Sequence, residues 1–287
     1  MSEPAQEPRR RNWKKLQRRQ AAEAEAFLKS RERWCMNACS RFINRDSLGN
    51  KVWVLHDSTG HITALIVHSK QSLLPVFSGH KIIPPPRFLR NPFGTVHVYS
   101  IQGRREDAEV LEIALEKMGL PTAEKIDYEL MCLDCPPGNF RSAGPPALVI
   151  RKPQPPDMDA LAALHAAYEK EEVLPAASTF NAAASRANTE RIFAKEQMLV
   201  AELGGRLVGK INTNAVTFTR FQAGGVYVRP YCRGLGIARR MAGEFAESLI
   251  AQGRGVSLFV KKSNPAARRV YEHIGFETEG DYRISYY

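Results

Sequence analysis

Apolar positions along the first half of the chain follow two periods, one typical of strands and one typical of helices. Short apolar runs rich in β-branched residues predict strands, because successive side chains of a strand face opposite sides of a sheet. These runs cover residues 52–55, 62–68, 73–77, 96–101 and 128–133. Helical spacing of apolar residues predicts one helix over 17–44 and another over 105–118, which Gly119 ends.

The second half shows the same two periods in a longer series. Runs of strand type cover residues 147–151, 198–203, 207–212, 216–228, 256–260 and 283–287. Runs of helical type cover residues 157–171, 181–195, 237–249 and 265–274. The predicted order is therefore β-α-α-β-β-β-α-β-α-β.

Composition along the chain predicts two domains and a linker. A length of 287 residues is sufficient for two separate cores. The stretch CPPGNFRSAGPP is rich in Pro, Gly and Ser, which is typical of a linker. We expect a basic tail over 1–16, an α+β domain over 17–134, the linker over 135–146 and a second domain over 147–287.

The most informative stretch reads VYVRPYCRGLGIARRM and begins at Val226. A strand pattern ends at Pro230, a turn containing Gly234 and Gly236 follows, and a helical pattern begins at Ile237. A turn of this kind directs several backbone N–H groups, together with the positive end of the helix dipole, at one point. It therefore predicts a phosphate site, although the glycine spacing fits neither a dinucleotide-binding fingerprint nor a P-loop.

Two motifs in this half resemble those of the GNAT superfamily of acyl-CoA-dependent N-acyltransferases. Arg233-x-x-Gly236-x-Ala238 is similar to the pyrophosphate loop of that family. The later string NPAARRVYEHIGF is similar to the last conserved helix of the family, with its Asn264, its Tyr271 and its closing Gly-Phe. The two motifs follow each other in the family's order and on the expected elements, and the resemblance covers roughly residues 147–287.

The resemblance implies an α+β GNAT fold, with a mixed, mostly antiparallel sheet that helices cover on both faces. It also implies acetyl-CoA as co-substrate, with no metal. In the family, two adjacent strands splay apart and expose backbone groups to the pantetheine arm, and Val228 is the expected donor to the thioester carbonyl. The expected acetyl-CoA contacts are Val226, Tyr227, Val228, Arg233, Gly234, Leu235, Gly236, Ile237, Ala238, Arg239, Asn264 and Tyr271.

The same resemblance proposes Tyr271 as the general acid that protonates the leaving thiolate. Many family members carry a basic glutamate on the strand before the loop, but residues 217–228 of this chain contain no Asp or Glu. The acidic run YEKEEVLP offers Glu171 and Glu172 as base candidates. Glu169, Glu202, Tyr227 or a chain of water molecules are alternatives, and the acidic run also suits attraction of a cationic amine.

The first half has a similar rhythm, which leads to the hypothesis of a degenerate GNAT-like domain that no longer binds CoA. Its strand-turn-helix segment contains the turn 103–107 with a single glycine. Glu106 and Asp107 would occupy the positive end of the helix dipole and repel phosphate. The alternative is an α+β domain unrelated to GNAT.

Composition narrows the class of protein. Hydrophobic content of 44% and charged content of 25% are ordinary for a globular domain, and no apolar run approaches a membrane span. The N-terminus has no apolar core of a secretory signal, so we expect a cytoplasmic protein. The net charge of +11 is concentrated partly in the first nineteen residues, which we interpret as a solvated helix start rather than a nucleic-acid site.

The five cysteines are expected to be reduced thiols. Cys35, Cys39, Cys132 and Cys135 are together a conceivable zinc set, but their predicted positions in a helix and a strand favour buried thiols. Cys232 is expected to be a spacer before the loop.

Together these features predict an N-acetyltransferase that moves an acetyl or other acyl group to a primary amine of a small molecule or peptide. The reaction would be a direct attack in a ternary complex. The alternative is a catalytically silent, CoA-binding sensor module. The sequence identifies neither the acceptor nor the acyl length, and it leaves an oligomer open.

Overall fold

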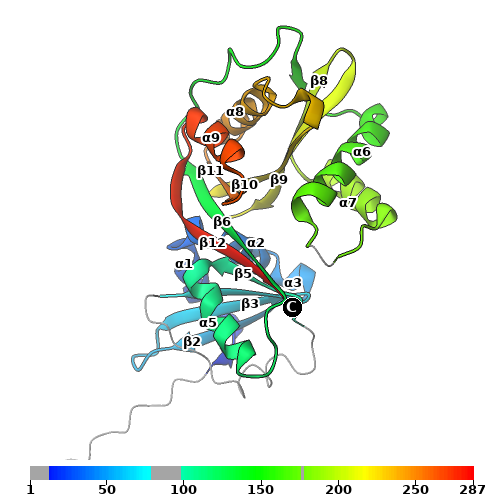
Figure 1. The fold of residues 1–287 in the computed structure, drawn as a ribbon. Helices are drawn as coiled ribbons and strands as arrows, with labels where there is room; N and C mark the ends of the chain where they lie inside the picture. Colours follow the sequence, from blue (N-terminus) through cyan, green and yellow to red (C-terminus); the bar gives the residue numbers. More distant parts are fainter. Residues whose placement is uncertain (1–12, 79–97, 176–177) are drawn as a thin grey trace, which may run out of the picture. The chain divides into compact units, whose positions relative to one another are not determined.

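The structure, a computed structural model, describes residues 13–78, 98–175 and 178–287. The chain forms two compact units, each with sheet and helices (Figure 1). Unit 1 contains Met1–Tyr128 and Gly280–Tyr287, and unit 2 contains Glu129–Glu279. The division therefore differs from the predicted one, because the last eight residues belong to unit 1 and the predicted linker belongs to unit 2. Among the described residues, no helix has the length and apolar character needed to cross a membrane.

Unit 1 is built on a mixed sheet. Its strands are, in spatial order, β1 (Lys14–Lys15), β2 (Lys51–His56), β3 (Ile62–Ser69), β4 (Ser72–Phe77), β5 (Ser100–Arg104) and the end of β12 (Glu277–Tyr286). Its helices are α1 (Ala21–Lys29), α2 (Met36–Ile43), α3 (Arg45–Leu48) and α5 (Arg105–Glu116), and β6 (Glu124–Leu133) begins in it. Neighbouring strands are antiparallel except β4 and β5, which run parallel.

The single helix predicted over 17–44 is interrupted in the structure. A 3-10 turn, Arg18–Gln20, precedes α1, and a second one, Glu32–Trp34, separates α1 from α2. The break begins where the Ser30 hydroxyl donates back to the Phe27 carbonyl, and it ends at Cys35, whose φ of −133° is not helical. Side-chain bonds of this kind compete with the helical ladder, which explains the interruption.

Polar bonds fix the end of β12 within unit 1. Arg283 binds the Asp127 carboxylate with an Nε–Oδ1 distance of 2.7 Å, and Ser285 donates to Glu112 at 2.5 Å. Tyr282 is buried and its hydroxyl accepts a hydrogen bond from Asn37 at 2.9 Å. Buried polar groups that are satisfied in this way hold a strand in one register.

Unit 2 is built on a sheet whose strands have the order β7 (Val149–Arg151), β8 (Met198–Leu203), β9 (Arg206–Val216), β10 (Arg220–Val228), β11 (Gly255–Lys261) and β6. The pairs from β7 to β10 are antiparallel, and β10 and β11 are parallel. The helices are α6 (Met158–Tyr168), α7 (Ala182–Lys195), α8 (Ile237–Ile250) and α9 (Pro265–Ile274). Short turns of helical type are Pro155–Asp157, Glu169–Val173 and Pro230–Cys232.

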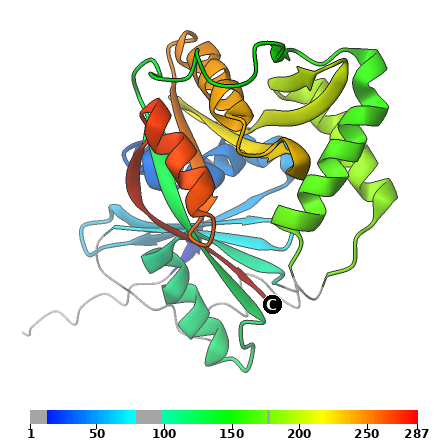
Figure 2. The same cartoon turned by 45° about the horizontal axis from the view of Figure 1, so that its top comes forward.

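Helices cover both faces of this sheet, as predicted (Figure 2). Phe221 and Ala223 of β10 pack in the cluster that includes α8 and α9. Tyr227 of the same strand packs in a second cluster with α6 and α7. The α+β fold class and the order of elements expected for residues 147–287 are confirmed.

The segment 135–146 is part of the core of unit 2. Phe140 is 2% exposed, and a Cβ added to Gly243 of α8 would lie 2.2 Å from its ring. Ala143 is also buried. The glycine in α8 thus makes room for an aromatic anchor from a stretch that composition alone marks as a linker.

The parallel strand pair of unit 1 changes the interpretation of the turn 103–107. In unit 2 the glycine turn follows β10, which comes before its parallel partner β11 in the chain. In unit 1 the turn 103–107 follows β5, the later strand of its parallel pair. A counterpart of the phosphate turn would therefore follow β4, where residues 79–97 lie outside the described residues. The GNAT-like nature of unit 1 stays a prediction.

Candidate active site

The central strands of unit 2 separate at the candidate site. All residues of β10 and β11 are described, yet the two strands pair only at Arg220 with Gly255, Phe221 with Val256 and Gln222 with Ser257. Beyond these pairs β10 continues to Val228 and β11 to Lys261 without pairing to each other. The edge of β10 that faces β11 therefore offers backbone groups to an extended ligand, because a strand edge without a partner presents free N–H and C=O groups.

The turn after β10 leads into α8, whose first backbone N–H groups have no partner inside the helix. Gly234 and Gly236 have φ of 79° and 80°, in the left-handed region that favours glycine. Gly236 is the N-cap of α8, and within the described residues no side chain caps this end and no acidic residue lies in its first turn. The first N–H groups of a helix have no partner inside the helix, so this end is prepared for an anion.

The turn packs tightly on one side and is open on the other. A Cβ on Gly236 would lie 2.9 Å from the backbone nitrogen of Gly144, whereas a Cβ on Gly234 would meet no atom within 4 Å. Leu235 is 48% exposed on the open side. Arg239 in the first turn of α8 has a buried Nε without a hydrogen-bond partner in the described part of the chain.

The Arg233 side chain binds neighbouring groups of the protein. Its guanidinium forms an ion pair with Glu171 at 2.7 Å and donates to the Val228 carbonyl at 3.0 Å. The hydrogen bond from Arg233 is the main reason why the pKa of Glu171 lies below its usual value. The nearby Tyr227 hydroxyl contributes to the same lowering of the pKa of Glu171. A carboxylate held in this way is a poor proton acceptor until Arg233 leaves it.

The second motif forms the helix that sequence predicted. Asn264 caps α9 by accepting a hydrogen bond from the Ala267 N–H at 3.0 Å, and Pro265 occupies the first helical position. Gly275 ends the helix with a φ of 102°. These local signals confirm the predicted cap. A contact of Asn264 with CoA stays a prediction.

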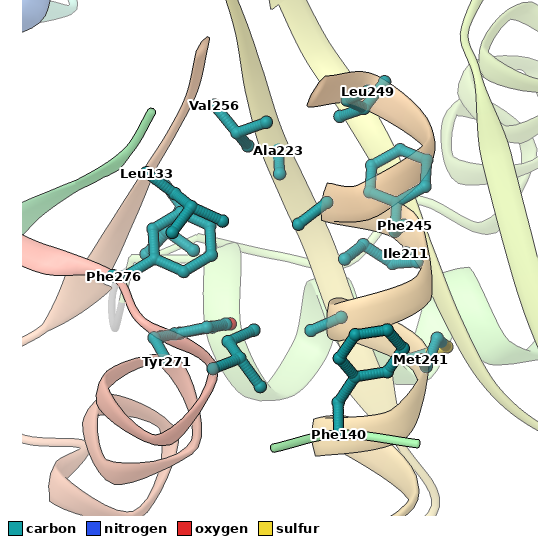
Figure 3. Packing of buried hydrophobic residues seen from close by; sticks show 14 of the residues in the cluster. Leu133, Phe140, Ile211, Ala223, Met241, Phe245, Leu249, Val256, Tyr271 and Phe276 are labelled. Atoms are coloured by element: carbon teal, nitrogen blue, oxygen red, sulfur yellow. The ribbon is translucent and has the colours of Figure 1, made fainter. Parts of the chain in front are cut away.

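Tyr271 extends from α9 into the buried cluster and meets Phe276 edge to face at 5.9 Å (Figure 3). Its hydroxyl has no hydrogen-bond partner among the described residues. Burial, followed by the nearby Tyr168 and Glu172, raises its pKa well above the usual value for tyrosine. The phenol therefore stays protonated near neutral pH, which is the state that a proton donor requires.

The remaining base candidates lie in different settings. Glu172 forms an ion pair with Lys261 of β11 at 3.5 Å, close enough to influence both Tyr168 and Tyr271. Glu202 binds Arg151 at 2.7 Å, which ties β8 to β7 and gives this glutamate a structural role. Glu172 is thus the predicted base candidate whose charge acts on Tyr271.

Comparison with known proteins supports the reading of these motifs. The sequence model of the acetyltransferase (GNAT) family matches residues 161–276. Residues 161–276 are a GNAT acetyltransferase domain. The match begins in α6 and ends just after α9, so it contains the separating strands, the glycine turn and Tyr271.

Two solved structures of similar fold extend over nearly the whole chain. A GCN5-related N-acetyltransferase from Sphaerobacter thermophilus shares 19% identity at a TM-score of 0.59, covering 97% of this chain and 95% of that one. A Drosophila protein shares 11% identity at a TM-score of 0.65, covering 96% and 99%. A GNAT-family protein from Novosphingobium aromaticivorans shares 23% identity over 57% of this chain and 65% of that one, with a TM-score of only 0.43. No curated protein sequence matches this chain.

The GNAT domain also contains a buried polar cluster that sequence reasoning missed. His165 and Tyr168 of α6, Lys210 of β9 and Asn188 of α7 form it together with Glu169. Burial lowers the pKa of His165 to about 4, so its ring is neutral near pH 7. The signal in the sequence was Lys210 in LVGKINTN, a lysine within an otherwise buried strand.

The cysteines are placed separately. Cys35 and Cys39 lie 3.5 Å apart at their sulfurs in unit 1, and Cys132 lies 3.3 Å from the Ser257 hydroxyl in unit 2. Cys232 is buried before the glycine turn. Among the described residues, no three His, Cys, Asp or Glu side chains are grouped as metal ligands.

Proposed function

We propose that this protein is an N-acetyltransferase that transfers an acetyl group from acetyl-CoA to a primary amine of a small molecule or peptide. The observation that carries the proposal is the separation of β10 from β11, followed at once by an uncapped helix start with two left-handed glycines. In this arrangement an extended backbone edge is followed along the chain by an anion site. The edge suits the pantetheine arm of CoA, and the anion site suits its diphosphate.

The loop residues would hold the co-substrate through backbone donors. The N–H groups from Gly234 to Arg239 would bind the diphosphate, and Arg233 would add charge after leaving Glu171. Val226 to Val228 would bind the pantetheine arm along the open strand edge, with the Val228 N–H directed to the thioester carbonyl. Acetyl-CoA supplies the activated acyl group. Donors fixed in the fold stabilise the carbonyl oxygen as it gains negative charge.

The side chains would then move two protons. The neutral amine attacks the carbonyl carbon, the new C–N bond replaces the C–S bond, and Tyr271 gives its hydroxyl proton to the departing sulfur. Glu172 would accept the proton that the amine loses, with Glu171 available once Arg233 has turned to the diphosphate. The acidic run would also attract a cationic acceptor.

A second function is favoured by one observation. β10 contains no carboxylate, and Glu171 is held by Arg233. A protein with these two features can bind CoA without catalysing acyl transfer, as a sensor does. The cytoplasmic location and the lack of nucleic-acid partners stay predictions of the sequence.

Two measurements test the proposal. Calorimetry with CoA, dephospho-CoA and pantetheine should show binding of the two diphosphate-containing ligands and a much weaker interaction with pantetheine. Thiol release from acetyl-CoA over a broad amine panel should then show turnover with at least one amine. Tight CoA binding without turnover would favour the sensor, and equal binding of CoA and pantetheine would contradict the loop assignment.

A further inference from the structure

Lys210 is an unusual residue for the inside of a sheet. It is 0% exposed on β9, where it pairs with Tyr227 near the end of β10. Its ammonium nitrogen donates to the Gly225 carbonyl at 2.8 Å and to the Asn212 side-chain oxygen at 3.3 Å. The same nitrogen lies 4.5 Å from the centre of the Tyr168 ring. The ammonium group, which has three N–H donors, is thus surrounded by two oxygen acceptors and the face of an aromatic ring.

Gly225 lies in a bulge of β10, in the part of this strand that no longer pairs with β11. Gly224 pairs with Asn212 and Tyr227 pairs with Lys210, so residues 225 and 226 lie opposite Ile211 alone and β10 has one extra residue in the ladder. Gly225 has a φ of 60°, and an added Cβ would lie 2.1 Å from the Asn212 side-chain oxygen. A bulge bends its strand and redirects the residues that follow.

Both backbone groups of Gly225 face side chains from neighbouring elements. Its carbonyl accepts a hydrogen bond from Lys210 at 2.8 Å, and its N–H is near enough to the Tyr168 hydroxyl to oppose the rise that burial causes in the pKa of that phenol. Without these neighbours the bulge would leave buried backbone groups of Gly225 without partners, which is unfavourable. Lys210 and Tyr168 therefore act as a clamp on a single residue, and this Lys210–Tyr168 clamp defines the course of β10 toward Val228.

The clamp responds to the charge of Lys210. Burial lowers the pKa of Lys210 to about 7, and only Glu169 opposes this shift. The other titratable groups around it are His165 and Tyr168 on α6 and Tyr227 on β10. A hydrogen bond from an ammonium is roughly twice as strong as one from a neutral amine. The clamp is therefore tighter below pH 7 than above it.

We propose that Lys210 is a positioning residue for acyl transfer, which fixes the Gly225 bulge and thereby aims the backbone of Val226 to Val228 at the thioester carbonyl. This inference rests on the proposed function. Lys210 itself is enclosed by protein and acts through the bulge rather than on the substrate. Misplacing a catalytic donor by 1 Å costs about a hundredfold in rate, so a loosened bulge should show mainly in kcat.

The test compares Lys210→Met and Tyr168→Phe with wild type. Lys210→Met keeps the volume and removes the donor, and Tyr168→Phe keeps the ring and removes the acceptor for the Gly225 N–H. For Lys210→Met we expect kcat to fall about ten- to hundredfold, while the Kd for CoA changes by less than about threefold. Wild-type kcat should show an inflection near pH 7, where the charge of Lys210 changes, and this variant should lack it. Lys195→Met, at an exposed position on α7, is the matched control and should behave as wild type.

Hydrogen–deuterium exchange of residues 223–228 makes the test independent of turnover. Both clamp variants should exchange faster in this segment than wild type, and Lys195→Met should not. Unchanged exchange together with an unchanged kcat and pH profile in Lys210→Met would overturn the inference. If both clamp variants exchange faster than wild type but wild type acetylates no amine, the proposed function fails and the clamp stands. If Lys210→Met does not fold, the exchange and kcat of Tyr168→Phe decide.

Discussion

Replacing Gly236 by alanine tests how the turn before α8 is built. Gly236 has a φ of 80°, and an added Cβ would lie 2.9 Å from the backbone nitrogen of Gly144. The left-handed conformation costs a non-glycine residue about 1–2 kcal/mol. Overpacking against a backbone atom adds about 1–3 kcal/mol, because backbone cannot rotate away as a side chain can. We expect Gly236→Ala to lower the free energy of unfolding of unit 2 by about 2–5 kcal/mol.

Gly205 is the matched control. It has a φ of 73° in the turn between β8 and β9, and its added Cβ would meet no atom within 4 Å. Gly205→Ala should therefore show only the conformational cost of about 1–2 kcal/mol. CoA affinity should fall at least about tenfold in Gly236→Ala, because the donor groups of the turn move, and stay unchanged in Gly205→Ala.

The choice of probe matters for this measurement. The three tryptophans of the chain, Trp13, Trp34 and Trp53, all lie in unit 1, so their fluorescence follows that unit. Unit 2 is better followed by far-ultraviolet circular dichroism and by amide exchange in α8 during urea unfolding. Equal losses of stability in the two variants, with equal CoA affinity, would refute the tight packing of the turn and its role in binding.

Three further outcomes are expected. Tyr271→Phe should lower kcat about tenfold with little change in KM for acetyl-CoA, and an unchanged kcat would remove this phenol from the mechanism. Glu171→Gln should tighten CoA binding by up to about fivefold in calorimetry, because Arg233 no longer has to leave an exposed ion pair; weaker binding would contradict this order of events. Burial raises the pKa of Asp107 in unit 1 from 3.8 to about 7. The folded state then holds a proton that the unfolded state releases, so stability should fall on the order of 3–4 kcal/mol as pH rises from about 4 to about 7. Asp107→Asn should abolish that fall in tryptophan-monitored unfolding. If the stability of this variant still fell with rising pH, a group other than Asp107 would be responsible.

Local signals explain why much of unit 2 was predictable. Asn264, Pro265 and Gly275 each act within a few residues of their own position, so the bounds of α9 follow from the sequence. Gly234 and Gly236 likewise reveal the turn, because a positive φ favours glycine wherever it occurs.

Features that depend on distant partners could not be predicted in this way. The buried clamp requires Lys210, Tyr168 and Gly225 to meet across three elements. A lysine within a buried strand is a local signal, but it does not reveal the partners that the lysine meets. The segment 135–146 looks like a linker by composition, yet Phe140 finds its place only because Gly243 leaves space on α8. Tertiary packing decides such cases over local propensity.

The position of β12 has a consequence for synthesis on the ribosome. Unit 1 consists of the earliest residues and of Gly280–Tyr287, with all of unit 2 between them in the chain. Until Tyr282–Tyr286 have been translated, β5 lacks the antiparallel partner that covers its edge, and Glu112 lacks Ser285 and Arg283. Domains generally fold as they emerge. Unit 1 therefore cannot complete its sheet before the end of the chain is available, and the edge of β5 stays unpaired until then.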